Sequence, residues 1–332
     1  MSNEKNNVLL EVKDLVVQYV TSDETVEAVN GVSFTLNKGE ALGLVGETGA
    51  GKTTIAKSIM RILPDPPAKV VGGEIYFDGE DLFAMTEQQM RDVRGNKISM
   101  IFQDPMSALN PVFTVGEQIG EVIGLHDKKL SKHEINEATK KMLEMVGIPG
   151  SRASEYPHQF SGGMKQRIVI AIALACNPEL LLADEPTTAL DVTIQAQVLD
   201  MMHKLKDELG TSLILITHDL GIVAENCDKV AVTYAGEIVE FGNLEDLYDH
   251  HMHPYTEGLF GSLPDIEGDD ERLHPIDGMP PDPTQLPVGC NFAERCPYAT
   301  DECTKAAIPA FEVSPGHLVR CVKAKVAAEG GK

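Results

Sequence analysis

Residues 46–53 read GETGAGKT, which places two glycines, a lysine and a threonine at the spacing G-x-x-x-x-G-K-T. Glycines let the backbone turn its N–H groups inward, where they bind phosphate oxygens together with the positive end of a following helix. Lys52 is spaced to reach the outer phosphates of a nucleotide, and the Thr53 hydroxyl is a suitable ligand for Mg²⁺. The predicted phosphate site comprises Gly46, Glu47, Thr48, Gly49, Ala50, Gly51, Lys52, Thr53 and Thr54.

A second element that can do chemistry is LLLADEP at residues 180–186. It reads as an apolar strand that delivers Asp184 and Glu185 at its carboxyl end, where α/β sheets bind their ligands. Asp184 suits a magnesium role through water, and Glu185 suits a general base that takes a proton from an attacking water. Phosphoryl transfer depends mainly on positioning and charge neutralisation, and the two elements supply both.

The segment FSGGMKQR at residues 160–167 predicts a second anion-binding helix N-terminus, at Ser161, Gly162 and Gly163. One nucleotide rarely needs two such sites from one chain, whereas two chains that face each other can each close the other's site. This segment resembles the signature motif of ABC ATPases. The common form of that motif is L-S-G-G-Q, and Phe160 and Met164 depart from it.

The other marks of the ABC ATPases follow in the expected order. Gln103 in MIFQDP resembles the Q-loop, Asp191 in TTALD resembles the D-loop, and His218 in LITHD resembles the switch histidine that contacts the γ-phosphate. Tyr19 stands where the adenine-stacking aromatic residue is expected. The resemblance assigns catalysis to Glu185, His218 and Gln103, and Mg²⁺ binding to Thr53, Gln103 and Asp184.

Longer segments, among them SMIFQDPMSALNPVFTVGEQI and HPYTEGLFGSLP, resemble the ATPase subunits of dipeptide and oligopeptide importers, and GGMKQR and EPTTALDVT resemble the D-type subunit. The resemblance covers nearly the whole chain. It implies ATP hydrolysis that powers peptide import, with ATP and Mg²⁺ as cofactors. The implied partners are a second ABC ATPase subunit in a heterodimer, two transmembrane permease subunits and, indirectly, an extracytoplasmic substrate-binding protein. The implied location is the cytoplasmic face of the membrane.

Strand-like and helix-like segments alternate along the chain, which predicts an α/β fold with a largely parallel sheet. The resemblance makes this a P-loop NTPase with a RecA-like core, an antiparallel β subdomain and a helical subdomain at about residues 104–165. The expected ATPase domain covers residues 1–258. A connection rich in proline, glycine and acidic residues then leads into a C-terminal extension, residues 259–332.

Composition narrows the possible partners and location. The chain has 51 acidic residues against 28 lysines and arginines, a formal charge of −23, which argues against unaided binding to nucleic acid or anionic lipid. The longest apolar run, residues 168–176, is shorter than the roughly 20 residues that a membrane-spanning helix needs. With no secretory signal visible at the start, we expect a soluble cytoplasmic protein.

Four of the six cysteines lie in the tail: Cys290, Cys296, Cys303 and Cys321. In a cytoplasmic protein such a group suggests metal or redox chemistry before structural disulfides. Zinc sites use closer cysteine pairs, and ferredoxin spacing also differs, so the pattern alone leaves a cluster, zinc, free thiols or a disulfide open. The resemblance to the C-terminal extension of the peptide-importer ATPases implies a [4Fe–4S] cluster.

Three other functions compete with peptide import. Related importers handle nickel or other small solutes, because selectivity rests with the binding protein and permease. A non-transport ABC ATPase, acting on ribosomes or DNA, usually carries two cassettes or a long coiled-coil insertion, and this chain has neither. The third alternative is a metal-sensing or interaction module whose function depends mainly on the cysteine tail. The sequence favours the importer subunit.

Overall fold

The computed structural model describes residues 7–188, 190–262 and 275–325. The chain divides into two compact units that are interleaved along the sequence. The first unit contains the described residues up to 10, residues 36–41 and residues 77–216. The second contains residues 11–35, residues 42–76 and the described residues from 217 onward.

The first unit is built on three parallel strands in the order β8, β7, β6. All three are buried over their whole length, the pattern of a parallel sheet that is covered on both faces. The elements of this unit are β5 (Glu80–Asp81), α2 (Glu87–Val93), β6 (Ile98–Ile101), α3 (Pro105–Ala108), α4 (Val115–His126), α5 (Lys132–Met145), two short 3-10 helices (Gly150–Ser154 and Pro157–Gln159), α6 (Gly162–Leu174), β7 (Leu180–Asp184), α7 (Val192–Leu209) and β8 (Ser212–Thr217).

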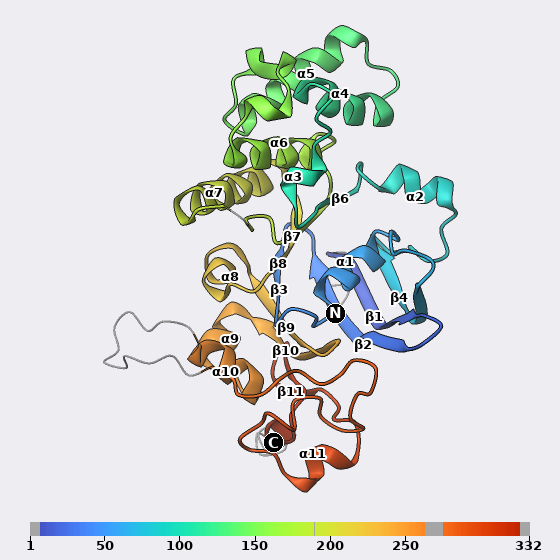
Figure 1. Cartoon of the computed structure of the whole chain (residues 1–332), viewed down its shortest axis with the longest axis vertical. Helices are drawn as coiled ribbons and strands as arrows, with labels where there is room; N and C mark the ends of the chain where they lie inside the picture. Colours follow the sequence, from blue (N-terminus) through green and yellow to red (C-terminus); the bar gives the residue numbers. More distant parts are fainter. Residues whose placement is uncertain (1–6, 189, 263–274, 326–332) are drawn as a thin grey trace. The chain divides into compact units, whose positions relative to one another are not determined.

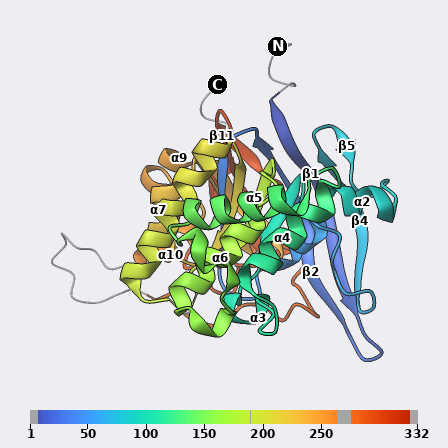
Figure 2. The same cartoon turned by 90° about the horizontal axis from the view of Figure 1, so that it is seen from above.

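Helices α4 and α5 lie within the range of the expected helical subdomain, about residues 104–165. Each begins at a capping box, with Thr114 and Glu117 at the start of α4 and Ser131 and Glu134 at the start of α5. A methyl group added at Gly120 would lie only 3.2 Å from Ile135, so this glycine permits close packing of the two helices. Figure 2 shows α4 and α5 lying beside α6 within this unit.

The second unit contains both parallel and antiparallel strand pairs. Strand β3 pairs in parallel with β9, and β9 pairs with β10 in an antiparallel hairpin. A separate sheet holds β2, β1 and β4 in that order. The elements are β1 (Val8–Val20), β2 (Thr25–Asn37), β3 (Ala41–Val45), α1 (Lys52–Ile59), β4 (Ala68–Phe77), α8 (Leu220–Asn226), β9 (Lys229–Tyr234), β10 (Glu237–Asn243), α9 (Leu244–Asp249), α10 (Pro254–Gly261), α11 (Asp301–Lys305), β11 (Phe311–Ser314) and β12 (His317–Val319).

The cysteine-containing tail shares the core of the second unit. Strand β12 pairs with β10, and β11 pairs with β12, so two strands of the tail extend the sheet (Figure 1). Phe292 is 2% exposed and packs with Tyr234 and Tyr255. Within the expected connection rich in proline, glycine and acidic residues, residues 263–274 lie outside the described residues.

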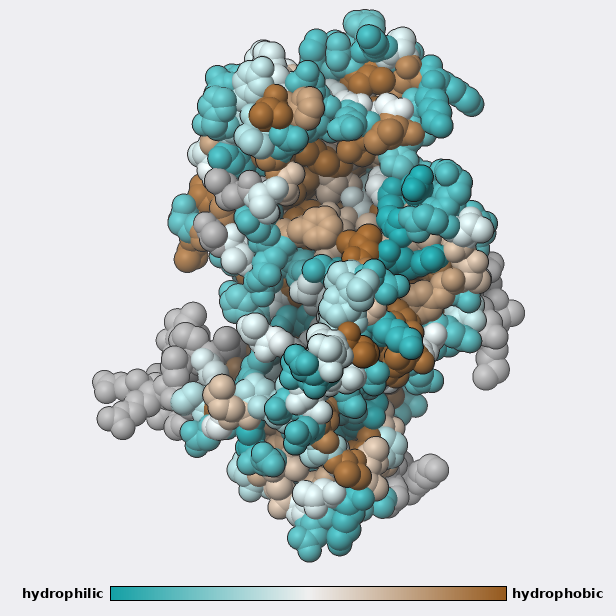
Figure 3. Space-filling model, turned by 45° about the vertical axis from the view of Figure 1, so that its right-hand side comes forward, coloured by the Kyte–Doolittle hydropathy of each residue, from teal (hydrophilic) through white to brown (hydrophobic). Residues whose placement is uncertain are grey.

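The predicted α/β fold with a parallel-sheet core is confirmed. Within residues 7–188, 190–262 and 275–325, no helix combines the length and the apolar character that crossing a membrane would require. The surface in Figure 3 is mostly hydrophilic with separate apolar patches. Large exposed apolar side chains of the first unit include Phe102, Val112, Phe113 and Leu125.

Candidate nucleotide-binding site

The GETGAGKT loop follows β3 and has a conformation that only glycine fits at two positions. Gly46 has φ 147° and Gly51 has φ 94°. A Cβ on Gly46 would lie 2.1 Å from the Thr233 carbonyl oxygen, and one on Gly51 would lie 2.4 Å from that of Ala28. Helix α1 begins directly after Gly51, which offers no capping side chain to its first turn. The positive end of α1 and the loop backbone therefore suit an anionic phosphate group.

Two side chains of the predicted site lie around this loop. Lys52 is 7% exposed, and its ammonium group donates hydrogen bonds to the carbonyl oxygens of Gly46 at 2.6 Å and Glu47 at 2.9 Å. The half-buried Tyr19 hydroxyl lies 3.2 Å from that of Thr54, which holds the aromatic ring beside the start of α1. The second unit thus brings a cation, an aromatic ring and the phosphate loop together.

The acidic pair lies at the carboxyl end of β7, in the first unit. Asp184 is 2% exposed. Glu185 follows it with φ 46°, a left-handed conformation that costs a non-glycine residue about 1–3 kcal/mol and is typical of functional sites. The Glu185 carboxylate accepts hydrogen bonds of 2.9 Å from the Gln103 amide and 2.9 Å from the Thr188 hydroxyl. These two donors orient the carboxylate.

The SGG segment opens α6 as predicted. Ser161 is the N-cap, and its hydroxyl accepts a hydrogen bond of 3.4 Å from the Met164 N–H. No acidic residue occupies the first turn of α6, so the helix presents its positive end. A Cβ on Gly163 would lie 2.6 Å from the Ile194 side chain of α7, whereas a Cβ on Gly162 would meet open space.

The two departures from the common signature pack against one arginine. The Arg152 guanidinium carbon lies 4.3 Å from the centre of the Phe160 ring, and the same group donates a hydrogen bond to the Met164 sulfur. Arg152 also pairs with Glu155 at 2.6 Å. Phe160 and Met164 are therefore accommodated by a cation–π and sulfur contact that does not use the Ser-Gly-Gly backbone.

Gln166 joins the signature helix to the acidic loop, a role that the sequence analysis missed. Its side chain is fully buried, and its amide donates a hydrogen bond to the carbonyl oxygen of Pro186, the residue after Glu185.

Asp191 caps α7 by accepting a hydrogen bond of 3.0 Å from the Ile194 N–H. The predicted site residues of the first unit are Gln103, Ser161, Gly162, Gly163, Asp184, Glu185 and Asp191.

The predicted residues of the second unit are Tyr19, residues 46–54 and His218. His218 is exposed and lies directly after β8. Tyr255 and Arg295 were not identified from the sequence, yet both contact the phosphate loop, where their partner is Glu47. They lie more than 200 residues along the chain from that loop, so no local pattern could have assigned them this contact.

Comparison with known proteins decides the family. The family model for ABC transporters matches residues 29–188, and the model for the C-terminal region of oligopeptide/dipeptide transporters matches residues 239–303. A probable peptide ABC transporter ATP-binding protein of Sinorhizobium fredii is 50% identical over 323 residues, which cover 96% of each chain. The chain belongs to the family of peptide ABC transporter ATP-binding proteins.

Two further relatives and a solved structure agree with this membership in the ABC family. The dipeptide transport ATP-binding protein of Bacillus subtilis is 50% identical, with 94% of each chain covered. The oligopeptide transport ATP-binding protein of Escherichia coli is 46% identical, with 97% of this chain and 95% of that protein covered. A dimeric ATP-binding cassette in a post-hydrolysis state with ADP and phosphate superposes with a TM-score of 0.64. It is 27% identical, with 71% of this chain and 99% of that chain covered.

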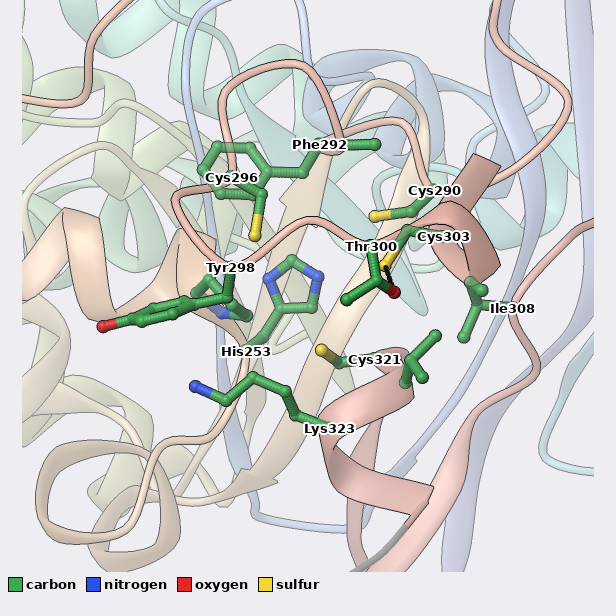
Figure 4. Close-up of a pocket in the computed structure, with 13 residues that line it drawn as sticks. His253, Cys290, Phe292, Cys296, Tyr298, Thr300, Cys303, Ile308, Cys321 and Lys323 are labelled. Atoms are coloured by element: carbon green, nitrogen blue, oxygen red, sulfur yellow. Dashed lines mark hydrogen bonds between the residues drawn. The ribbon is translucent and has the colours of Figure 1, made fainter. Parts of the chain in front are cut away.

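The tail of this ABC ATPase does not bear out the metal prediction. Figure 4 shows that Cys290, Cys296, Cys303 and Cys321 line one cavity, whose volume is about 240 Å³. However, no group of three or more histidine, cysteine, aspartate or glutamate side chains among the described residues is arranged to hold a metal ion. The predicted iron–sulfur cluster is therefore wrong, and the zinc alternative has no support.

The chemistry of these thiols gives a physical reason. Burial raises the pKa of Cys290 to about 11 and also raises the pKa of Cys296 and of Cys321. Burial therefore disfavours the thiolate, which is the form that binds metals. Cys290 and Cys296 are partly buried and pack against the core cluster that contains Phe292, as small apolar side chains do.

Proposed function

We propose that this ABC ATPase powers the import of dipeptides or oligopeptides by binding and hydrolysing ATP at loop 46–54. The match of the C-terminal region to the oligopeptide/dipeptide transporter model carries the choice of cargo class. The names of the relatives, which describe peptide, dipeptide and oligopeptide transport, support it. Near-complete mutual coverage of those chains supports a shared role in a transporter.

In this proposal the chain's own residues prepare the reaction. The loop N–H groups and Lys52 bind the phosphates, and the Tyr19 ring stacks on the base. Thr53, Gln103 and Asp184 hold Mg²⁺, which neutralises the negative charge of the phosphates when it is bound. Glu185 accepts the proton of a water molecule as that water attacks the γ-phosphorus, and the bond from this phosphorus to ADP breaks. Gln103 orients Glu185, and His218 contacts the γ-phosphate.

The remaining site residues serve a second chain. Ser161, Gly162 and Gly163 act on the nucleotide that a partner ATPase subunit holds, and Asp191 lies at the same interface. We propose a heterodimer of ATPase subunits that is bound to two permease subunits at the cytoplasmic face of the membrane. A substrate-binding protein delivers the cargo to the permease subunits, and nucleic acid is not a partner. The ATPase domain covers residues 1–258, and the extension covers residues 259–332.

Purification in mild detergent tests this function. The tagged chain, expressed in its native organism from its chromosomal gene, should co-purify with a second ABC ATPase and two permease subunits. The complex in liposomes, given its binding protein, should take up a labelled dipeptide or oligopeptide only when ATP is present. Uptake of Ni²⁺ in place of peptide would show a different cargo. Co-purification of ribosomes without any permease would contradict the transporter role itself.

A further inference from the structure

Glu47 of the phosphate loop is held through its carboxylate, its backbone N–H and its carbonyl oxygen. Its carboxylate accepts two hydrogen bonds from Arg295 of the tail, at 2.9 Å and 3.0 Å. Its backbone N–H donates to the Tyr255 hydroxyl at 2.9 Å. Its carbonyl oxygen accepts from the Lys52 ammonium group at 2.9 Å. Glu47 therefore links the lysine of the loop to Tyr255 and Arg295, which lie more than 200 residues further along the chain.

Arg295 is itself immobilised on every side. Its side chain is 6% exposed. Besides Glu47, it donates hydrogen bonds of 3.2 Å to the Tyr234 hydroxyl and 3.0 Å to the Asp277 carbonyl oxygen, and one of 3.4 Å to that of Ile276. A planar guanidinium group can make all of these contacts at once, which a lysine cannot. The ion pair with Glu47 therefore has a defined bidentate geometry, with the guanidinium group buried and the Glu47 side chain 28% exposed.

The turn that carries Arg295 is anchored in the core. The Arg295 N–H donates to the Phe292 carbonyl oxygen at 3.0 Å. The Phe292 ring lies 5.3 Å from the ring of Tyr234 and 5.4 Å from that of Tyr255. Figure 4 shows Phe292 and Cys296, which flank Arg295 in sequence, beside the cavity of the four cysteines. A rigid part of the tail therefore presents Arg295 to the loop.

We propose that Arg295 is a positioning residue for ATP binding. Through the bidentate pair it fixes Glu47, and through Glu47 it fixes the loop backbone and Lys52 in the geometry that phosphates require. The proposal rests on the proposed function, namely that loop 46–54 binds ATP. If the pair only fastened the tail, its loss would lower stability and leave nucleotide affinity unchanged.

Binding of a fluorescent ATP analogue with Mg²⁺ to the purified full chain, together with the melting temperature, tests this role. Arg295→Gln should weaken binding by about tenfold, because it removes a charge-assisted bidentate contact. Glu47→Gln should weaken binding similarly, and the double variant should be no worse than either single one. Arg295→Lys keeps the positive charge but loses the bidentate geometry of the guanidinium group. Its affinity for the analogue should lie between those of Arg295→Gln and the wild type.

Arg320→Gln is the matched control. Arg320 lies in the same tail and donates a hydrogen bond of 3.1 Å to the Ile308 carbonyl oxygen, with its carboxylate partner Glu237 at 3.7 Å. The Arg320→Gln variant should bind the analogue as tightly as the wild type does, even if its melting temperature changes. Wild-type affinity in Arg295→Gln, or an equal loss in Arg320→Gln, would overturn the positioning role. If Lys52→Ala binds as tightly as the wild type, the proposed ATP site itself is wrong.

Discussion

The side-chain amide of Gln103 donates a hydrogen bond of 2.9 Å to the carboxylate of Glu185. The two residues follow β6 and β7, which are adjacent parallel strands with Ile101 opposite Ala183. Parallel pairing therefore brings together two side chains that are 82 positions apart in sequence. The contact orients the proposed general base.

Removal of this contact should slow hydrolysis without preventing nucleotide binding. Gln103→Ala removes a side-chain donor that orients the Glu185 carboxylate, so this carboxylate should sample unproductive orientations. Turnover by the assembled transporter should fall by about tenfold or more, because proton transfer depends on hydrogen-bond geometry. Unchanged turnover, measured beside unchanged ATP affinity, would show that Gln103 does not position Glu185.

The two-chain arrangement predicts a separable defect at Ser161. Ser161→Arg adds bulk and charge at the N-terminus of α6, where the nucleotide of the partner should dock. The purified single chain should still bind ATP, while ATP-driven association of the two ATPase subunits and turnover of the complex should be lost. Loss of ATP binding by the single chain, with association intact, would contradict this arrangement.

The stability of the fold should fall on mild acidification because His253 is completely buried. Burial lowers the pKa of His253 to about 4, so the folded chain keeps it neutral while the unfolded chain protonates it below about pH 6.5. The unfolded state thus binds more protons between these values. The free energy of unfolding should decrease by about 2 kcal/mol from pH 7 to pH 5 through this residue.

Urea unfolding of His253→Asn at both pH values measures this contribution. The variant should lose most of that pH dependence, and His203→Gln, at a more exposed position on α7, should keep it. Glu240 affects the free energy of unfolding at lower pH. Burial alone would raise the pKa of Glu240, but its hydrogen bonds, of which that from His317 is the strongest, lower this pKa overall. Its contribution is therefore lost only as the pH falls below about 4.5. An unchanged slope in His253→Asn would contradict the account of His253.

The sequence predicted the elements that carry strong local patterns. The glycine spacing of the phosphate loop and the apolar strand before Asp184 act over a few positions, so they can be recognised from short windows. The hairpin of β9 and β10 is likewise local.

Contacts between distant segments could not be predicted in the same way. Strands β11 and β12 are four and three residues long. They are defined by the pairing of β12 with β10 and of β11 with β12 rather than by their own pattern. Arg295 meets Glu47 across 248 positions, and Gln166 meets the acidic loop across 20. The cysteine spacing was compatible with several chemistries, and the metal-bound one was the wrong choice.

Hydrolysis by the Glu185→Gln variant in the assembled transporter is the most direct test of the central claim, that this chain is an ATPase with Glu185 as its general base. The amide keeps the shape of the carboxylate but cannot accept the proton of the attacking water. The variant should bind ATP as the wild type does and lose turnover by a factor on the order of 100 or more. Hydrolysis at the wild-type rate would contradict the account.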